Sequence, residues 1–406
     1  MVELLSPARN MACVSAAINN GADAVYVGIS DYNMRANVAN MELDDIREVC
    51  MQCHDNGVKL YVCTNTIVSD RQLAKYEQQL DKLHAIGVDA LIISDMGMLN
   101  IARNYPLDIH LSVQANVTNT EALKLYEELG VTRAVLSREL SLEQIKQIKE
   151  KSPIEIETFI HGAMCVAVSG RCFLSSYFYN RNANCGECLQ PCRQEWHIQS
   201  TDDKKLIISP PEDNDIEKSR LLSPNDMCMI EHIPELIEAG IDAFKIEGRA
   251  RAPDYVSTTT KCYHDAIKLN SDGLWQSKSE ELIPYWMEQL RGVFNRGFDT
   301  GFYYRVPYKT SFDNKATYKK EDIGQVVNYY KKINVAEIKL WSKLEVGDTI
   351  LVQGNKTGSI TQKVESMQID GVNVNQAENE SVGIKMDETV RENDHVYRKV
   401  PVKECF

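Results

Sequence analysis

The first 160 residues alternate short apolar, β-branched segments with amphipathic stretches of helical period. This alternation is typical of repeated strand–helix units that build a parallel sheet. Because eight parallel strands can close on themselves, we predict a TIM-like (β/α)8 barrel, an α/β fold. The eight predicted strands are Glu3–Leu5, Ala24–Val27, Leu60–Cys63, Ala90–Ile93, Ile109–Leu111, Arg133–Leu136, Ile154–Phe159 and, far downstream, Asp242–Ile246.

The 406-residue chain is longer than one hydrophobic core usually organises, which predicts a second domain. We assign residues 1–310 to the barrel. Short strands separated by Gly-Asp and Asp-Gly turns then predict a small all-β barrel over residues 311–406. An insertion at about residues 160–240 separates the last two barrel strands and exceeds any ordinary connection. Its second half, Glu195–Leu222, is predicted to form a β-hairpin around residues 201–204.

Composition limits which membrane and nucleic-acid partners the protein is expected to have. No run of about 18 apolar residues occurs, and the start lacks the basic leader and apolar core of a secretory signal, so we expect a cytoplasmic protein without a membrane partner. The formal net charge of −13 opposes non-specific attraction to nucleic acid, which therefore requires a local basic patch. No feature predicts an oligomeric state. The candidates for the patch are Arg181, Arg193, Lys319, Lys320, Lys331 and Lys332.

Polar side chains follow the predicted strands, where barrel enzymes carry their catalytic residues. They include Asn65, Gln114, Asn116, Arg138, His161, Glu247 and Arg249. For any single one of these residues, a capping or turn role is the ordinary alternative. Arg138 and Arg249 depart from that alternative, because a guanidinium at a strand end offers a planar donor pair for a carboxylate or phosphate.

Five cysteines fall within 28 residues, at Cys165, Cys172, Cys185, Cys188 and Cys192. In a cytoplasmic protein they are expected to be thiols, and their density predicts a metal site. Thiolates bind both structural zinc and iron–sulfur clusters. The wide first spacing is unlike the two C-x2-C pairs of a zinc ribbon and favours an iron–sulfur cluster, with zinc as the alternative. Cys228 is a further candidate ligand.

The motifs of common hydrolases are absent from the sequence. It contains no H-E-x-x-H zinc motif, no G-x-S-x-G nucleophile turn and no phosphate-binding G-K-[ST] loop. A proteolytic activity would therefore need a less familiar site.

Several segments resemble the peptidase U32 family. The segments Glu157–Cys165 (ETFIHGAMC) and Gly170–Ser175 (GRCFLS) are similar to its signature. The resemblance extends over residues 1 to about 310, and the C-terminal part resembles the small β-domain of the family. Further segments that resemble the family are Glu3–Ala8, Gly21–Gly28, Ser137–Ser141 and Phe244–Arg249.

The resemblance implies two kinds of activity. Some members of the family are described as collagenase-like proteases, and others as oxygen-independent hydroxylases that carry a [4Fe-4S] cluster and act on tRNA uridine, ribosomal RNA cytidine or a ubiquinone precursor. This chain resembles most the tRNA hydroxylases that use prephenate to form 5-hydroxyuridine at the wobble position. That activity is our expectation. A U32-type peptidase and a zinc-stabilised, non-catalytic RNA-binding protein are the alternatives.

The same resemblance assigns roles to residues. The implied cluster ligands are Cys165, Cys172, Cys188 and Cys192, with Cys185 or Cys228 as a substitute for one of them. Prephenate, a small dicarboxylate, is expected to be bound by Arg138, Arg249, Gln114, Asn116 and Asn65. Glu247 and His161 are then the candidates for proton transfer.

Overall fold

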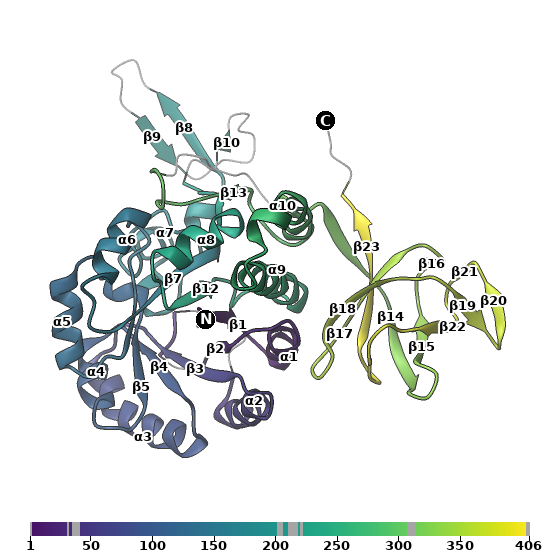
Figure 1. Cartoon of the computed structure of the whole chain (residues 1–406), viewed down its shortest axis with the longest axis horizontal. Helices are drawn as coiled ribbons and strands as arrows, with labels where there is room; N and C mark the ends of the chain where they lie inside the picture. The colour runs from purple at the N-terminus through teal and green to yellow at the C-terminus, as the bar shows by residue number, and fades with distance from the viewer. Residues whose placement is uncertain are drawn as a thin grey trace.

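A computed structural model describes residues 2–30, 32–34, 41–200, 206–209, 218–219, 222–306 and 314–402. The chain folds into a barrel and a β-rich C-terminal region, which lie side by side in Figure 1. Within the described ranges, no helix is long and apolar enough to cross a membrane.

Eight parallel strands form a closed barrel, because the last of them, β12, pairs with both β1 and β7. The prediction of eight strands and of a TIM-like barrel is confirmed. The strands are β1 (Glu3–Pro7), β2 (Ala24–Gly28), β3 (Lys59–Thr64), β4 (Ala90–Ile93), β5 (Asp108–Leu111), β6 (Arg133–Val135), β7 (Glu155–Gly162) and β12 (Ala243–Ile246).

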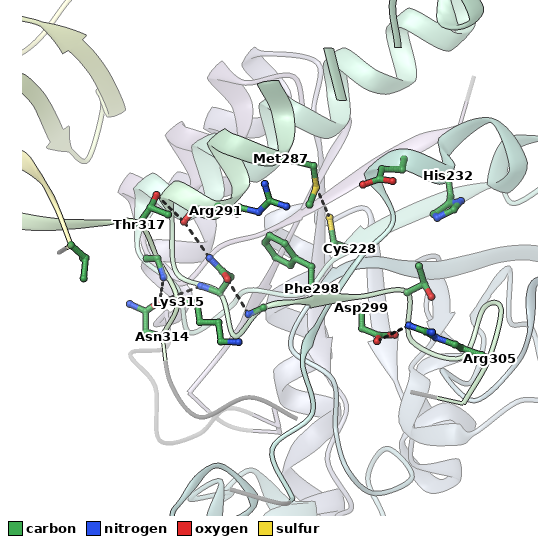
Figure 2. Close-up of a pocket in the computed structure, with 16 residues that line it drawn as sticks. Cys228, His232, Met287, Arg291, Phe298, Asp299, Arg305, Asn314, Lys315 and Thr317 are labelled. Atoms are coloured by element: carbon green, nitrogen blue, oxygen red, sulfur yellow. Dashed lines mark hydrogen bonds and ion pairs between the residues drawn. The ribbon is translucent and has the colours of Figure 1, made fainter. Parts of the chain in front are cut away.

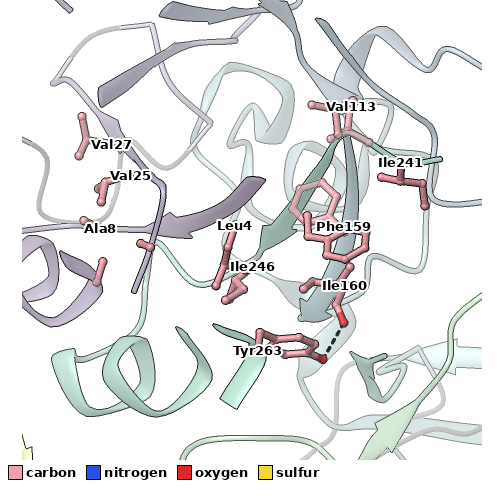
Figure 3. Packing of buried hydrophobic residues seen from close by; sticks show 14 of the residues in the cluster. Leu4, Ala8, Val25, Val27, Val113, Phe159, Ile160, Ile241, Ile246 and Tyr263 are labelled. Atoms are coloured by element: carbon pink, nitrogen blue, oxygen red, sulfur yellow. Dashed lines mark hydrogen bonds between the residues drawn. The ribbon is translucent and has the colours of Figure 1, made fainter. Parts of the chain in front are cut away.

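Helices cover the outside of the barrel and bury their apolar faces against the strands. Figure 3 shows this packing where Leu4 and Ile246 meet Tyr263, whose hydroxyl donates to the Ile160 carbonyl at 2.9 Å. The helices are α1 (Met11–Asn19), α2 (Leu43–Asp55), α3 (Asp70–Ile86), α4 (Met96–Ala102), α5 (Thr120–Glu128), α6 (Leu142–Lys149), α8 (Ile233–Glu238), α9 (Pro253–Ser271) and α10 (Trp275–Gly292).

The barrel interior carries charged side chains as well as apolar ones. Lys245 Nζ lies 2.6 Å from Glu157 Oε1, and Arg133 Nη1 lies 3.6 Å from the other Glu157 oxygen. Arg133 also pairs with Glu3 at 2.5 Å. Burial of single charges is costly, so this network has to be paired to be tolerated. This charged network makes part of the barrel interior polar.

The insertion contains the cysteine-rich loop, with α7 (Leu174–Tyr179), η2 (Ala183–Cys185) and η3 (Pro191–Arg193), and then an antiparallel pair, β8 (Trp196–Ser200) and β9 (Leu206–Ser209). This pair confirms the predicted hairpin, whereas its predicted turn at residues 201–204 lies outside the described residues. Strand β10 (Lys218–Ser219) pairs with β8. Strand β11 (Asp226–Cys228) returns the chain to the barrel, antiparallel to β7 and beside β13 (Phe298–Asp299).

The C-terminal region is an antiparallel sheet around its own hydrophobic core, as the sequence predicts for an all-β region. It contacts α1 and α9 through β17 and β18 (Figure 1). A Cβ on Gly358 would lie 2.8 Å from the Ala16 nitrogen, so glycine permits this close approach. The main strands are β14 (Tyr318–Tyr330), β15 (Val335–Leu340), β17 (Thr349–Gly354), β18 (Gly358–Lys363), β19 (Met367–Ile369), β20 (Val372–Val374), β22 (Ser381–Lys385) and β23 (His395–Pro401), and a separate pair is β16 (Leu344–Glu345) with β21 (Gln376–Ala377).

Candidate functional site

A cavity of about 120 Å³ lies at the carboxyl ends of the barrel strands, under the cysteine-rich loop. Chemistry in TIM-like barrels is concentrated at this end. The cavity brings together residues that are far apart in the chain. Its lining includes ten of the residues singled out from the sequence, namely Asn65, Gln114, Arg138, Cys165, Cys172, Cys188, Cys192, Arg193, Glu247 and Arg249.

Four thiols of the cysteine-rich loop share this cavity. Burial, together with the nearby thiolates of Cys165, Cys188 and Cys172, raises the pKa of Cys192 to about 11. The four side chains therefore lie close enough to influence one another electrostatically. Within the described residues, no three His, Cys, Asp or Glu side chains already form a metal-binding group. The donor set is nevertheless the one that iron–sulfur clusters and zinc prefer, so the residues match such a group chemically.

Hydrogen bonds from the Arg193 guanidinium hold the cysteine-rich loop in place. Arg193, next to Cys192, donates to the Ser223 hydroxyl at 3.0 Å and to the Met164 carbonyl. Because Met164 precedes Cys165, one guanidinium connects the two ends of the loop. This role also removes Arg193 from the candidate phosphate contacts.

The two substitute ligands lie outside the cavity lining. The Cys185 thiol donates to the Ile67 carbonyl at 3.6 Å. Cys228 lines a separate cavity of about 680 Å³, where its sulfur lies 4.0 Å from that of Met287 (Figure 2). The other four cysteines all line the first cavity.

Arg138 is held at the cavity with unused donor capacity. Its Nη1 donates to the Ala163 carbonyl at 2.8 Å, its Nη2 lies 3.9 Å from Glu247 Oε2, and its plane stacks on Phe159. Its Nε is buried without a hydrogen-bond partner. A buried donor that lacks an acceptor is costly, and an anion in the cavity would satisfy it.

Arg249 also lines this cavity and is only 6 % exposed. Among the described residues it hydrogen-bonds to the Asn33 amide oxygen, at 3.3 Å, and has no carboxylate partner within ion-pair distance. A Cβ on Gly28 would overlap its Nη1, so the strand end at Gly28 leaves the space that this side chain fills. Arg138 and Arg249, which follow the distant strands β6 and β12, therefore line the same cavity.

The predicted amides behave differently from one another. Asn65 Nδ2 donates at 3.0 Å to both the Ser112 hydroxyl and the Gln114 side-chain oxygen, so Asn65 and Gln114 form one unit on the cavity wall. Asn116 does not line the cavity. It adopts a left-handed conformation (φ 55°) and donates to the Gln114 carbonyl at 2.7 Å, which shapes the loop that carries Gln114.

His161 is not brought to the cavity lining. Its ring packs against Tyr255, Tyr263 and Phe298, with Nδ1 3.2 Å from the Tyr263 hydroxyl. Burial lowers the pKa of His161 to about 3, so the ring stays neutral at ordinary pH. Of the two proton-transfer candidates, only Glu247 reaches the cavity.

Lys245 also lines the cavity, and the sequence analysis did not select it. Its ammonium lies 4.4 Å from the centre of the Tyr26 ring and pairs with Glu157 below. Its position inside a short apolar strand could have identified it, because such a position is buried in a closed barrel and a buried charge needs a partner.

The family model and the related proteins described below were found by comparison of the sequence with known proteins. The family model described as peptidase family U32 matches residues 9–313. A Methanocaldococcus jannaschii protein named an uncharacterized protease is 48 % identical, covering 98 % of each chain. A Porphyromonas gingivalis collagenase is 36 % identical, covering 98 % of this chain and 97 % of its own. The tRNA hydroxylation protein P1 of Bacillus subtilis is 33 % identical, covering 90 % and 86 %.

Proposed function

The chain belongs to the peptidase U32 family, and from this membership we propose that it is an oxygen-independent RNA hydroxylase that forms 5-hydroxyuridine at the tRNA wobble position. One observation carries the proposal. Four thiols, the guanidinium groups of Arg138, Arg193 and Arg249, and the Glu247 carboxylate line a single cavity at the carboxyl ends of the barrel strands. This set suits a redox cofactor next to a small anion.

We propose that Cys165, Cys172, Cys188 and Cys192 hold a [4Fe-4S] cluster. When bound, the cluster would supply electron transfer to the reaction. The role of the protein at this position is to hold the four thiols on one loop, whose ends are connected by Arg193.

Arg138 and Arg249 are the groups that would bind a dicarboxylate co-substrate such as prephenate. Arg249 is 6 % exposed and the Arg138 side chain is 10 % exposed. Among the described residues, Arg138 Nε has no acceptor, and Arg249 has no carboxylate partner within ion-pair distance. Charge-assisted hydrogen bonds to a carboxylate are about twice as strong as neutral ones. Glu247 Oε2 lies 3.9 Å from Arg138 Nη2, and we propose that Glu247 accepts or returns the proton.

Exposed aromatic residues on the cysteine-rich loop support RNA as the other substrate. Phe173 directly follows Cys172 and is 74 % exposed, and Tyr177 on α7 is 83 % exposed. Protein recognition of single-stranded RNA loops relies on stacking of splayed bases on such rings. A base extruded from an anticodon loop would stack here before its edge reaches the cavity.

The peptidase alternative has less support in the geometry. A Cys–His–Asp alignment does exist, with Cys50 3.8 Å from His54 and His54 2.9 Å from Asp89. However, Cys50 is only 3 % exposed, donates to the Gly87 carbonyl at 3.4 Å, and burial raises the pKa of its thiol. A nucleophilic cysteine needs the opposite conditions, namely access and a lowered pKa.

Nucleoside analysis tests the proposal. Digested tRNA and 23S ribosomal RNA from a strain without this gene would be compared by mass spectrometry with RNA from the parent strain. We expect 5-hydroxyuridine to be missing from tRNA and to return with the wild-type gene but not with Arg138→Gln. Unchanged tRNA together with loss of a ribosomal hydroxycytidine would move the substrate to ribosomal RNA. Unchanged RNA together with collagen cleavage by the purified protein would replace the proposal with a peptidase.

A further inference from the structure

A second cavity, of about 650 Å³, lies between the barrel and the C-terminal sheet. Its barrel side comes from the loops after β1 and β12 and from α9, and its other side comes from β14, β17, β18 and β23. We call it the interdomain cleft. Its charged lining residues are Arg9, Arg251, Asp254, Lys319, Lys320 and Lys399.

The interdomain cleft has five cations and one carboxylate, in a chain whose formal net charge is −13. Asp254 pairs with Lys320 at 2.8 Å, and Lys319 pairs with Glu321 at 3.1 Å. In the part of the chain that the structure describes, Arg9, Arg251 and Lys399 form no ion pair. A local excess of positive charge is therefore built into an acidic protein.

The three unpaired cations are held by their surroundings rather than extended into solvent. The Arg251 guanidinium lies 3.5 Å from the centre of the Phe294 ring, and the Lys399 ammonium lies 4.6 Å from that of Tyr318. Arg9 Nε is buried without a hydrogen-bond partner. Burial also lowers the pKa of Lys399, so an anion beside it would stabilise its charged form.

We propose that the interdomain cleft binds the phosphodiester backbone of the RNA substrate, with Arg9, Arg251 and Lys399 as its phosphate contacts. Guanidinium and ammonium groups that line a groove and form no ion pair among the described residues suit successive phosphates. This inference rests on the proposed function, since it names the surface that holds the same RNA.

The position of the cleft relative to the catalytic cavity agrees with this role. Arg251 follows the cavity residue Arg249 by two positions in the loop after β12, and Arg9 lies in the loop after β1. Both loops leave the carboxyl ends of barrel strands, the end at which the cavity opens. RNA in the cleft would therefore lie on the catalytic face.

The test is the salt dependence of RNA binding by the full-length protein. Fluorescence anisotropy of a fluorescein-labelled, unmodified tRNA transcript would be measured from low to physiological salt. For Arg251→Gln/Lys399→Gln we expect weaker binding and a slope of log affinity against log salt that is smaller by about two, about one per lost cation. The charge-conserving Arg251→Lys/Lys399→Arg should keep the wild-type slope. Lys75→Gln, an exposed site on α3 away from the cleft (Figure 1), should also keep it.

A wild-type slope in the double glutamine variant would overturn the inference. Binding of poly-glutamate without binding of tRNA would also overturn it, in favour of an acidic protein partner. If wild-type protein fails to bind the transcript, the cleft inference falls, whereas the hydroxylase proposal is decided separately by the nucleoside analysis. Failure of one is thus distinguishable from failure of the other.

Discussion

Arg138 Nη2 lies 3.9 Å from Glu247 Oε2, at the wall of the cavity that also holds the four thiols. The pair is long for a full ion pair, and Arg138 keeps one buried donor without an acceptor. The guanidinium is therefore positioned between a protein carboxylate and the open space. This arrangement suits a group that exchanges a weak internal partner for a ligand carboxylate.

Arg138→Gln should weaken binding of the dicarboxylate co-substrate by about 1.5–3 kcal/mol, roughly ten- to a hundredfold, because hydrogen bonds to charged groups contribute about that much. Isothermal titration of prephenate into anaerobically purified protein measures the change. Arg138→Lys keeps the charge but not the paired donors, so its affinity for prephenate should lie between those of the wild type and Arg138→Gln. Equal affinity in all three proteins would remove Arg138 from the ligand site.

The choice of cluster ligands predicts different outcomes for two cysteines of the same loop. Cys172→Ser should lose bound iron after anaerobic purification. Cys185→Ser should keep about four irons per chain, because Cys185 donates to the Ile67 carbonyl outside the cavity. Iron, sulfide and zinc analysis with an electronic spectrum gives the answer. Stoichiometric zinc without iron in the wild type would instead support a structural zinc site.

The sequence predicted the barrel well because its signals are local. Each strand is a short apolar run, and the charged or amide residue after it is adjacent in the chain, so Arg138, Glu247 and Arg249 could be placed at one end of the barrel. The cysteines of the cavity lie within a single loop. Their density indicated a metal site among five cysteines, whereas the choice of four of them came from the family resemblance.

His161 was misplaced for a reason that no local pattern reveals. Strict alternation along β7 would put it on the same face as Glu157 and Phe159. The register between β7 and β12 shifts, however, so that Lys245 pairs with Phe159 and Ile246 with His161. The extra residue is a β-bulge, which turns the following side chains to the other face. Of the interdomain cleft, the sequence indicated only Lys319 and Lys320, because Arg9, Arg251 and Lys399 come together only after folding.

Gly28→Ala should disturb co-substrate binding through Arg249 rather than through the main chain. The added methyl group would overlap Arg249 Nη1, the mobile end of a long side chain, so we expect a small change in thermal stability. Affinity for prephenate should fall in Gly28→Ala and in Arg249→Gln. In the double variant the two losses should not add, since both act on one guanidinium. Additive losses would mean that Gly28 acts elsewhere.

The acid sensitivity of the barrel should depend on Glu3. Burial alone would raise the pKa of this carboxyl, but the hydrogen bonds and charge of Arg133 outweigh it and hold the pKa below 4.5. A lowered pKa in the folded state means that the stabilising contribution is present above about pH 4.5 and is lost as pH falls through the folded value. Urea unfolding between pH 3 and 7 should show this loss in wild type and a flatter profile in Glu3→Gln. Parallel profiles would contradict it.

The exposed rings of the cysteine-rich loop should contribute to RNA affinity without contributing to stability. Phe173 and Tyr177 are 74 % and 83 % exposed, so alanine at either position removes little buried surface. Stacking of a base on an aromatic ring contributes about 1–3 kcal/mol, which predicts roughly five- to more than a hundredfold weaker binding of an anticodon stem-loop for each stacked base lost. Met51→Ala, at a 62 % exposed site on α2, is the matched control and should bind as wild type does.

Because stacking is less sensitive to salt than phosphate contacts are, the slope of log affinity against log salt should stay unchanged in Phe173→Ala and Tyr177→Ala, in contrast to the cleft variants. Wild-type affinity in both alanine variants would assign these rings to a different partner.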